Sequence, residues 1–217
     1  MSDTLTNLIA RVQIMLLDDG TQFSTATATA AIREALRQFN AAAPIAAGTL
    51  IDTVSGQYEY ALNDSAFTGL LDVLNVFWNP SATEGSDIIQ DFAFYWMDNA
   101  PFIRLKSPLP GATAILDVRY TLPHTINGLD SETESTLTAD QDQVLVQGAV
   151  AQCCYIRSAD RIESVNLAND TPEVWRNAGN TWAAAFGAGL RRYQRRPAPS
   201  QSADARAWND AWHTWSG

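Results

Sequence analysis

The first 44 residues constrain the fold most, because their apolar residues recur at the three- and four-residue steps of an amphipathic helix. The pattern occurs on both sides of a polar turn at residues 18–24, in two stripes made of Leu5, Leu8, Ile9, Val12, Met15 and Leu16, and of Ala28, Ala31, Ile32, Ala35, Leu36 and Phe39. Ser24 is placed to cap the second helix, and Pro44 ends it because proline lacks a backbone donor. The sequence therefore predicts a helical hairpin over residues 4–44, with no catalytic group on it.

The next segment shows the two-residue alternation of β-strands. Strands are predicted at residues 49–54, 57–62, 71–78, 102–106 and 112–120. Ser55-Gly56 joins the first two as a hairpin, and the proline-rich turn at residues 108–111 joins the last two. Residues 81–100 fit either a short helix or an irregular strand. These segments predict a small antiparallel meander.

Residues 121–138 form a long polar stretch that contains Asp130, Glu132 and Glu134. No apolar periodicity is present to hold this stretch against a core. The pattern is typical of a mobile acidic loop.

Helical periodicity returns at Ala139 and continues to about Asp160. A longer helix then begins at Thr171-Pro172-Glu173, where a capping hydroxyl, a proline at the first helical position and an acid near the positive end of the dipole coincide. Its apolar stripe consists of Trp175, Ala178, Trp182, Phe186, Gly189 and Tyr193. A Pro- and Ser-rich break at residues 197–202 ends this helix, and a short segment at residues 203–215 closes the chain.

The order of these elements predicts an α+β fold, mainly a helical bundle formed by both chain ends with an inserted antiparallel β subdomain. The expected divisions are residues 1–44 for the helical hairpin, 45–137 for the β subdomain with the acidic loop, 138–196 for the C-terminal helices and 197–217 for an extended docking arm.

Composition limits the class of protein. With 217 residues and 46% hydrophobic content, the chain can bury a core without covalent cross-links. Its two cysteines, Cys153 and Cys154, are sequence neighbours, which disfavours a mutual disulfide and favours a reduced cytoplasm as the place of synthesis. We find no signal peptide and no apolar run long enough to span a bilayer, so we expect a soluble protein that binds no membrane.

Charge is segregated along the chain. Residues 1–175 carry 8 Arg and Lys against 22 Asp and Glu, a net charge of −14, whereas residues 176–217 carry 6 Arg against 2 Asp, a net charge of +4. An acidic body repels a phosphate backbone, because affinity for nucleic acids comes largely from Lys and Arg. The sequence disfavours specific DNA binding.

Motifs for catalysis or metal binding are weak. His124 and His213 lie far apart, and Cys153-Cys154 lacks the spacing of a zinc or redox motif. Asp18-Asp19-Gly20 resembles half of a calcium loop without the later ligands. We therefore expect no catalytic residues, no metal and no cofactor.

The C-terminal end carries the strongest candidates for partner binding. Four arginines, Arg191, Arg192, Arg195 and Arg196, exceed what a helix dipole needs at its negative end. Trp208, Trp212 and Trp215 share one face if their segment is helical. These tryptophans either pack on their own bundle or dock into a partner, since Trp and Arg dominate interface hot spots.

The chain resembles the head-to-tail connector, or adaptor, proteins of tailed bacteriophages. The resemblance rests on Leu5-x-x-Leu8-Ile9-x-Arg11-Val12, the Asp18-Asp19-Gly20 turn, Phe23-Ser24, residues 31–39 (AIREALRQF), residues 58–62 (YEYAL), Asp117-Val118-Arg119-Tyr120 followed by Leu122-Pro123, and residues 147–151 (QGAVA). It covers most of residues 4–195. The enlarged aromatic β segment departs from the family layout.

That resemblance implies a structural virion protein made in the host cytoplasm and located at the neck. The protein would form a ring, typically twelve-fold, below the portal protein, with a central channel through which DNA passes. The C-terminal arginines and tryptophans would contact the portal, and Asp130, Glu132 and Glu134 would face the channel or the next tail component. The alternatives are a tail-completion or stopper protein of the same particle, and a carboxylate-dependent hydrolase.

Overall fold

The computed structural model describes residues 3–18, 20–79, 88–107, 115–162 and 171–194. Within these residues the elements are α1 (Leu5–Leu16), α2 (Thr25–Ala42), β1 (Ile45–Asp52), β2 (Glu59–Ala61), a 3-10 turn (Ser65–Phe67), β3 (Asp72–Asn79), β4 (Ile88–Ile89), β5 (Phe92–Met97), β6 (Ala100–Leu105), β7 (Ile115–Leu122), α3 (Ala139–Ile162) and α4 (Pro172–Tyr193). Helices and antiparallel strands occupy separate stretches of the chain, which confirms the α+β class.

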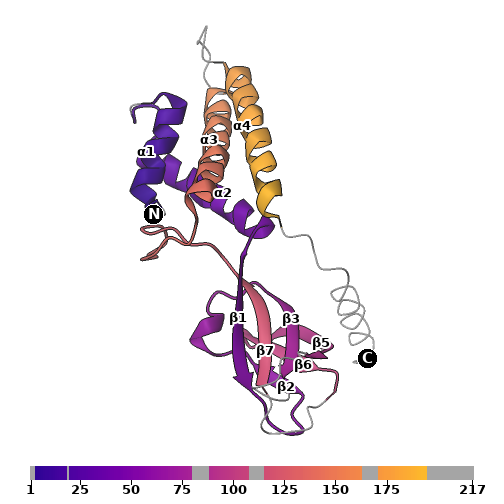
Figure 1. Ribbon diagram of the computed structural model, residues 1–217. Helices are drawn as coiled ribbons and strands as arrows, with labels where there is room; N and C mark the ends of the chain where they lie inside the picture. The colour runs from indigo at the N-terminus through magenta and orange to yellow at the C-terminus, as the bar shows by residue number, and fades with distance from the viewer. Residues whose placement is uncertain (1–2, 19, 80–87, 108–114, 163–170, 195–217) are drawn as a thin grey trace. The chain divides into compact units, whose positions relative to one another are not determined.

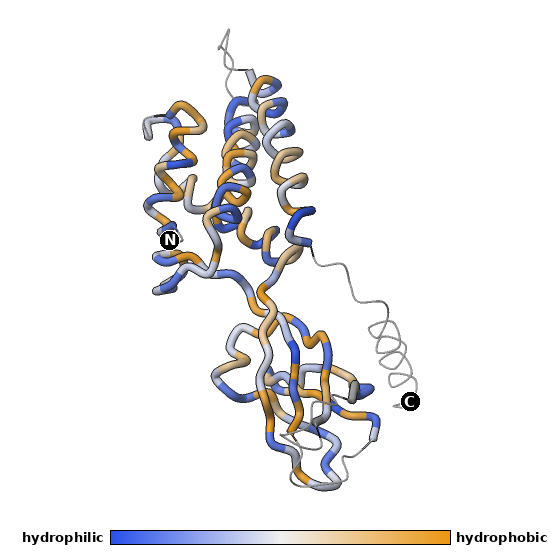
Figure 2. The backbone as a smooth tube through the Cα atoms, in the orientation of Figure 1, coloured by the Kyte–Doolittle hydropathy of each residue, from blue (hydrophilic) through white to orange (hydrophobic). Residues whose placement is uncertain are grey.

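The chain divides into two compact units. The helical unit comprises residues 3–44 and 124–194, and the β unit comprises residues 45–123, in each case where the structure describes them. Within the helical unit α3 and α4 lie side by side, and α1 and α2 also pack on α3 (Figure 1). Hydropathy along the tube alternates on these helices, as expected of elements that bury one face each (Figure 2).

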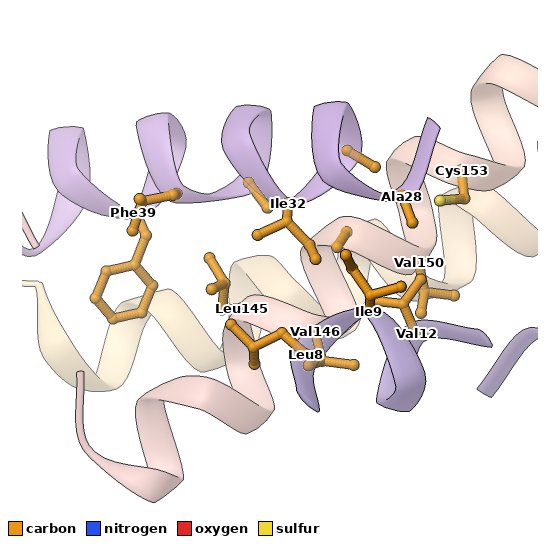
Figure 3. Packing of buried hydrophobic residues seen from close by; sticks show 14 of the residues in the cluster. Leu8, Ile9, Val12, Ala28, Ile32, Phe39, Leu145, Val146, Val150 and Cys153 are labelled. Carbon is orange, nitrogen blue, oxygen red and sulfur yellow. The ribbon is translucent and has the colours of Figure 1, made fainter. Parts of the chain in front are cut away.

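Both predicted N-terminal helices are confirmed, and their stripes are buried. Leu8, Val12, Ile32 and Phe39 are fully buried in one core with Leu145, Val146 and Val150 of α3 (Figure 3). Full burial of an aliphatic or phenyl side chain contributes about 1.5–3 kcal/mol. The core of this unit therefore joins residues that lie more than 100 positions apart.

The turn between α1 and α2 is held by its own side chains. The Asp18 carboxylate accepts the backbone N–H groups of Gln22 and Phe23 at 3.0 and 2.9 Å, and the Ser24 hydroxyl accepts the N–H of Thr27 at 3.1 Å. The bonds to Asp18 fix the turn, and the bond to Ser24 satisfies a donor that the start of α2 leaves without a partner in the helix. The predicted capping role of Ser24 is confirmed.

The contact between α3 and α4 depends on glycines. A Cβ on Gly189 would lie 2.7 Å from Val144, and a Cβ on Gly179 would lie 2.8 Å from Tyr155. Hydrogen atoms at these positions let the two helices approach closely. This agrees with the place of Gly189 in the predicted apolar stripe of this helix.

The predicted meander is wrong, because the strands form two sheets. One sheet has the order β1-β7-β3-β4 and the other the order β2-β6-β5, and all their pairs are antiparallel. A turn does form at Ser55-Gly56, where Gly56 has a φ of 78°, yet the strands on its two sides enter different sheets. Likewise β6 and β7 do not pair with each other.

The second sheet explains the ambiguous segment. Residues 92–97 form β5, which pairs with β6 from Phe92 opposite Leu105 to Met97 opposite Ala100. Phe92 and Phe94 pack against the core of the β unit, which contains Val76, Ile103 and Leu116. Of the two interpretations, the strand is correct for these residues.

The prediction of a loop without contacts to a core is also wrong. Ile126, Leu129 and Leu137 are buried and belong to the core of the helical unit. The structure therefore places residues 124–137 with the helices, and the β unit ends at Pro123 instead of residue 137. Apolar side chains at irregular spacing anchor this loop, so periodicity does not reveal them.

Candidate functional site

The acidic loop is a folded structure that presents its carboxylates outward. The N–H of Thr136 donates to the Thr125 carbonyl at 3.1 Å, the N–H of Gly128 to the Glu132 carbonyl at 2.8 Å, and the N–H of Asn127 to the Ser135 hydroxyl at 2.8 Å. Asp130 and Ser131 adopt positive φ values of 52° and 71° at its tip. Because Ile126 and Leu129 point into the core, Asp130, Glu132 and Glu134 are left exposed.

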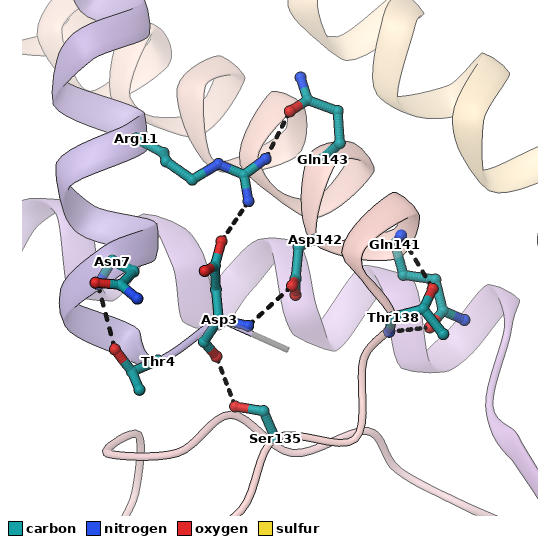
Figure 4. Close-up of polar contacts among 9 residues, drawn as sticks. All are labelled: Asp3, Thr4, Asn7, Arg11, Ser135, Thr138, Gln141, Asp142 and Gln143. Carbon is teal, nitrogen blue, oxygen red and sulfur yellow. Dashed lines mark hydrogen bonds and ion pairs between the residues drawn. The ribbon is translucent and has the colours of Figure 1, made fainter. Parts of the chain in front are cut away.

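The start of the chain ties this loop to α1 and α3. The N–H of Asp3 donates to the Asp142 carboxylate at 3.0 Å, and the Asp3 carbonyl accepts the Ser135 hydroxyl at 2.7 Å. The Asp3 carboxylate pairs with Arg11, whose other terminal nitrogen donates to the Gln143 side chain at 2.6 Å (Figure 4). One short segment thus joins three parts of the helical unit.

Asp142 is the buried carboxyl group of this network. Its side chain is 1% exposed, and its Oδ1 atom has no hydrogen-bond partner, whereas Oδ2 accepts the N–H of Asp3. Burial raises the pKa of Asp142 above its ordinary value, since desolvation disfavours the charged form. This group was not singled out from the sequence, where Asp140 and Asp142 look alike at the start of a helix.

The three acids of the loop differ in their pairing. Asp130 accepts three hydrogen bonds from two nitrogens of the Arg33 guanidinium, and this interaction holds the pKa of Asp130 below its usual range. Within the described residues, the carboxylates of Glu132 and Glu134 form no ion pair. The predicted acidic cluster is therefore one neutralised carboxylate and two exposed negative charges.

The arginines and tryptophans near the C-terminus fall into two groups. Arg191 and Arg192 are exposed in the last turn of α4. Arg195, Arg196, Trp208, Trp212 and Trp215 lie outside the described residues. The structure therefore tests only the exposure of the first two.

Other sequence candidates have structural roles. Cys153 and Cys154 are buried, and burial raises their pKa values to about 12 and about 11. His124 packs edge-on against Phe39, with ring centroids 5.4 Å apart, and burial lowers its pKa. No group of three metal-binding side chains occurs among the described residues, and none of their helices is long and apolar enough to cross a membrane.

Two exposed apolar features escaped the sequence interpretation. Ile14 and Leu17 at the end of α1 are 71% and 94% exposed, and Trp96 and Met97 at the tip of the β5–β6 hairpin are 54% and 47% exposed. The helical pattern does not show that Met15 packs against the core whereas Leu17 is exposed, because this difference depends on tertiary contacts. The hairpin turn lies at Asp98 and Asn99, which have φ values of 50° and 64°. Both residues belong to residues 81–100, for which the sequence did not distinguish a helix from a strand.

Comparison with known proteins decides the family. A family model described as SU10 adaptor protein matches residues 3–210, which is nearly the whole chain. The chain belongs to the SU10 adaptor protein family. This match confirms the resemblance to phage head-to-tail adaptors. The adaptor is therefore a structural protein of a phage particle with a connector role, and it is not an enzyme.

Two further comparisons add little to this family assignment. No curated protein matches the adaptor. A chain from a solved structure described as "Neck of empty GTA particle computed with C6 symmetry" covers 84% of the adaptor and 92% of its own length, at 10% identity and a TM-score of 0.30. A similarity at this level supports no conclusion about partners or symmetry.

Proposed function

We propose that this adaptor forms a ring of identical copies below the portal protein, extends the DNA channel and provides the attachment site for the tail. The family match over residues 3–210 is the observation that carries the proposal. A ring with twelve copies is the expected form. The next tail or stopper protein is the partner on the opposite side.

The charge of the chain supports passage of DNA without binding. The net charge of −10 comes from residues 1–175, which are acidic, whereas residues 176–217 carry a net positive charge. A negatively charged channel wall repels phosphates and does not retain the genome. The adaptor thus needs no base-reading element, and DNA is a passing cargo.

We assign portal docking to the arm at residues 197–217 together with Arg195 and Arg196. Its three tryptophans are spaced by four and three residues, and Trp and Arg are the residue types that contribute most to interfaces. Truncation after Pro199 removes the tryptophans and leaves every described helix and strand intact. Arg191 and Arg192 precede the arm, in the last turn of α4.

The experiment is a mass measurement of the purified adaptor with and without portal rings of the same particle. The full chain is expected to bind portal rings in a fixed ratio, and both the chain truncated after Pro199 and the Trp208→Ala, Trp212→Ala, Trp215→Ala variant are expected to lose that binding. Trp96→Ala is the matched control, because it removes an exposed tryptophan from the β unit. Binding of the truncated chain at full strength would contradict the docking role of the arm.

A tail-completion or stopper protein of the same particle is the second candidate, and the exposed hairpin tip favours it. Trp96 and Met97 extend the apolar strand β5 beyond the core, and Met and Trp are enriched at interfaces. In that case the β unit makes the main ring contact. Imaging of the portal complex separates the two roles by showing which unit touches the portal.

A further inference from the structure

The exposed charges of the helical unit are segregated between two surfaces. Among its described residues, the exposed arginines that form no ion pair or hydrogen bond are Arg176, Arg191 and Arg192, and all three lie on α4. The exposed carboxylates without a partner are Glu132, Glu134 and Asp140, near the acidic loop, and Glu173. Glu173 shares the first turns of α4 with Arg176, so the positive charge stands apart from these carboxylates only at Arg191 and Arg192, in the last turn of the helix.

These two surfaces lie at one end of the unit and on opposite sides of it. The acidic loop precedes α3 and packs beside the start of α1, where the N–H of Leu5 donates to the Asn127 carbonyl at 2.9 Å. The C-terminal end of α4 lies on the other side of α3 (Figure 1). A second copy placed beside the first in the same orientation therefore turns its acidic loop toward the side of the first copy on which α4 lies.

Both surfaces are held by contacts within the helical unit, and such preorganisation lowers the entropic cost of association. The loop is held by the backbone hydrogen bonds between residues 125 and 136 and by its buried Ile126 and Leu129. The helix α4 is held against α3 by the close approach at Gly179 and Gly189.

The outer face of α4 is suited to burial against another protein. Residues 177–190 contain no charged side chain. The exposed Asn180 and Thr181 already have partners, since Asn180 accepts the Tyr155 hydroxyl at 3.0 Å and Thr181 donates to the Asn177 carbonyl at 3.1 Å. Covering this face leaves few unpaired polar groups, so its desolvation costs little.

We propose that Glu132 and Glu134 of one copy bind Arg191 and Arg192 of the next copy, so that the acidic loop and the end of α4 form the contact between neighbours in the ring. The occupant is a second copy of this chain because the two surfaces are complementary in charge and belong to the same unit. Two different patches on opposite sides make a heterologous contact, the kind that generates rings. The inference rests on the proposed ring.

The test uses charge reversal and exchange in the full chain. One variant carries Arg191→Glu and Arg192→Glu, and the other carries Glu132→Arg and Glu134→Arg. Self-association is measured by sedimentation velocity over a range of protein concentrations, with portal rings and without them. Arg176→Glu is the matched control, since it reverses an exposed arginine at the far end of the same helix. Urea unfolding of each variant reports folding.

Each reversed variant is expected to self-associate about tenfold or more weakly than the original chain, because like charges then face each other. An equimolar mixture of the two variants is expected to associate more strongly than either alone, and Arg176→Glu is expected to behave like the original chain. High salt is expected to weaken the original association.

Three results overturn the inference. If the reversed variants assemble like the original chain, this contact is excluded, whereas the proposed ring is not. If particles with the Glu132 and Glu134 variant then differ in how well they retain DNA, these acids face the channel. A chain that stays monomeric with and without portal rings overturns the proposed ring itself, and the contact with it. A mixture that associates no better than its parts also excludes the pairing.

Discussion

The Arg33 guanidinium and the Asp130 carboxylate form an ion pair with 2.6 Å between Nη2 and Oδ1, although the two residues are 97 positions apart. Their side chains are 52% and 57% exposed. Exposed ion pairs contribute little to stability, because water and salt screen them. The pair therefore marks where the loop lies on α2, and the buried apolar residues hold the loop there.

Substitutions at Ile126 and at Asp130 should thus differ strongly in their effect on the free energy of unfolding. Ile126→Ala is expected to lower the free energy of unfolding by about 2–5 kcal/mol, since it leaves a cavity in the core of the helical unit. Asp130→Asn is expected to leave the urea midpoint nearly unchanged. Urea unfolding followed by circular dichroism compares them, and a large effect of Asp130→Asn would show that the ion pair holds the loop.

Two glycines of α4 provide a matched pair of substitutions. A Cβ on Gly189 would meet Val144 at 2.7 Å, whereas a Cβ on Gly187 would meet nothing within 4 Å. Gly189→Ala is expected to destabilise by about 1–3 kcal/mol through overpacking. Gly187→Ala is expected to stabilise by about 0.5–1 kcal/mol, because alanine favours the helix. Thermal unfolding checks both, and equal effects would contradict close packing at Gly189.

Leu17 is expected to stabilise the fold less than a glycine would at the same position. It ends α1 in the left-handed region, with φ 53° and ψ 37°, and its side chain is 94% exposed. Glycine adopts this conformation without the steric cost and is the usual residue at such helix ends. Leu17→Gly should raise the unfolding free energy by up to about 1 kcal/mol, as measured by urea titration. A loss of stability would reveal a packing role for Leu17.

Asp142 should lower the free energy of unfolding as the pH rises, whereas an acid in an ion pair raises it. Its folded-state pKa is raised by burial, so the ionised form opposes folding above that pKa. The unfolded chain loses this proton at a lower pH, and the penalty disappears as the pH falls through the raised pKa towards the unfolded value. Asp142→Asn should stabilise the protein at pH 7, with the gain shrinking in acid. Urea midpoints at several pH values measure this, and a gain that persists in acid would exclude the charge as its cause.

The two cysteines should be unreactive in the folded protein. Both are buried, and their thiol pKa values of about 12 and about 11 keep the thiolate population very small at neutral pH. A thiol reagent is expected to label neither cysteine in native buffer and both in denaturant. Mass spectrometry counts the labels. Rapid native labelling would indicate that α3 opens near these residues.

Helix positions followed from the sequence because helical periodicity is a local property. The stripe of α2 and the caps at Ser24 and Thr171 involve residues three or four positions apart, so neighbours in sequence report on one another. The end of α2 before Pro44 depends on that proline alone. The four helices of the residues that the structure describes were accordingly predictable.

Strand pairing and the loop depended on contacts between distant residues. The residue types of β1 indicated a strand, but its partner β7 lies about 70 positions away, with Ile45 opposite Leu122. In the same way, nothing near Asp142 in the sequence distinguishes it from Asp140, and only the approach of Asp3 and its neighbours buries it. Pairing partners, desolvation and the neutralisation of Asp130 by Arg33 are properties of the packed chain, because they arise when residues far apart in sequence meet.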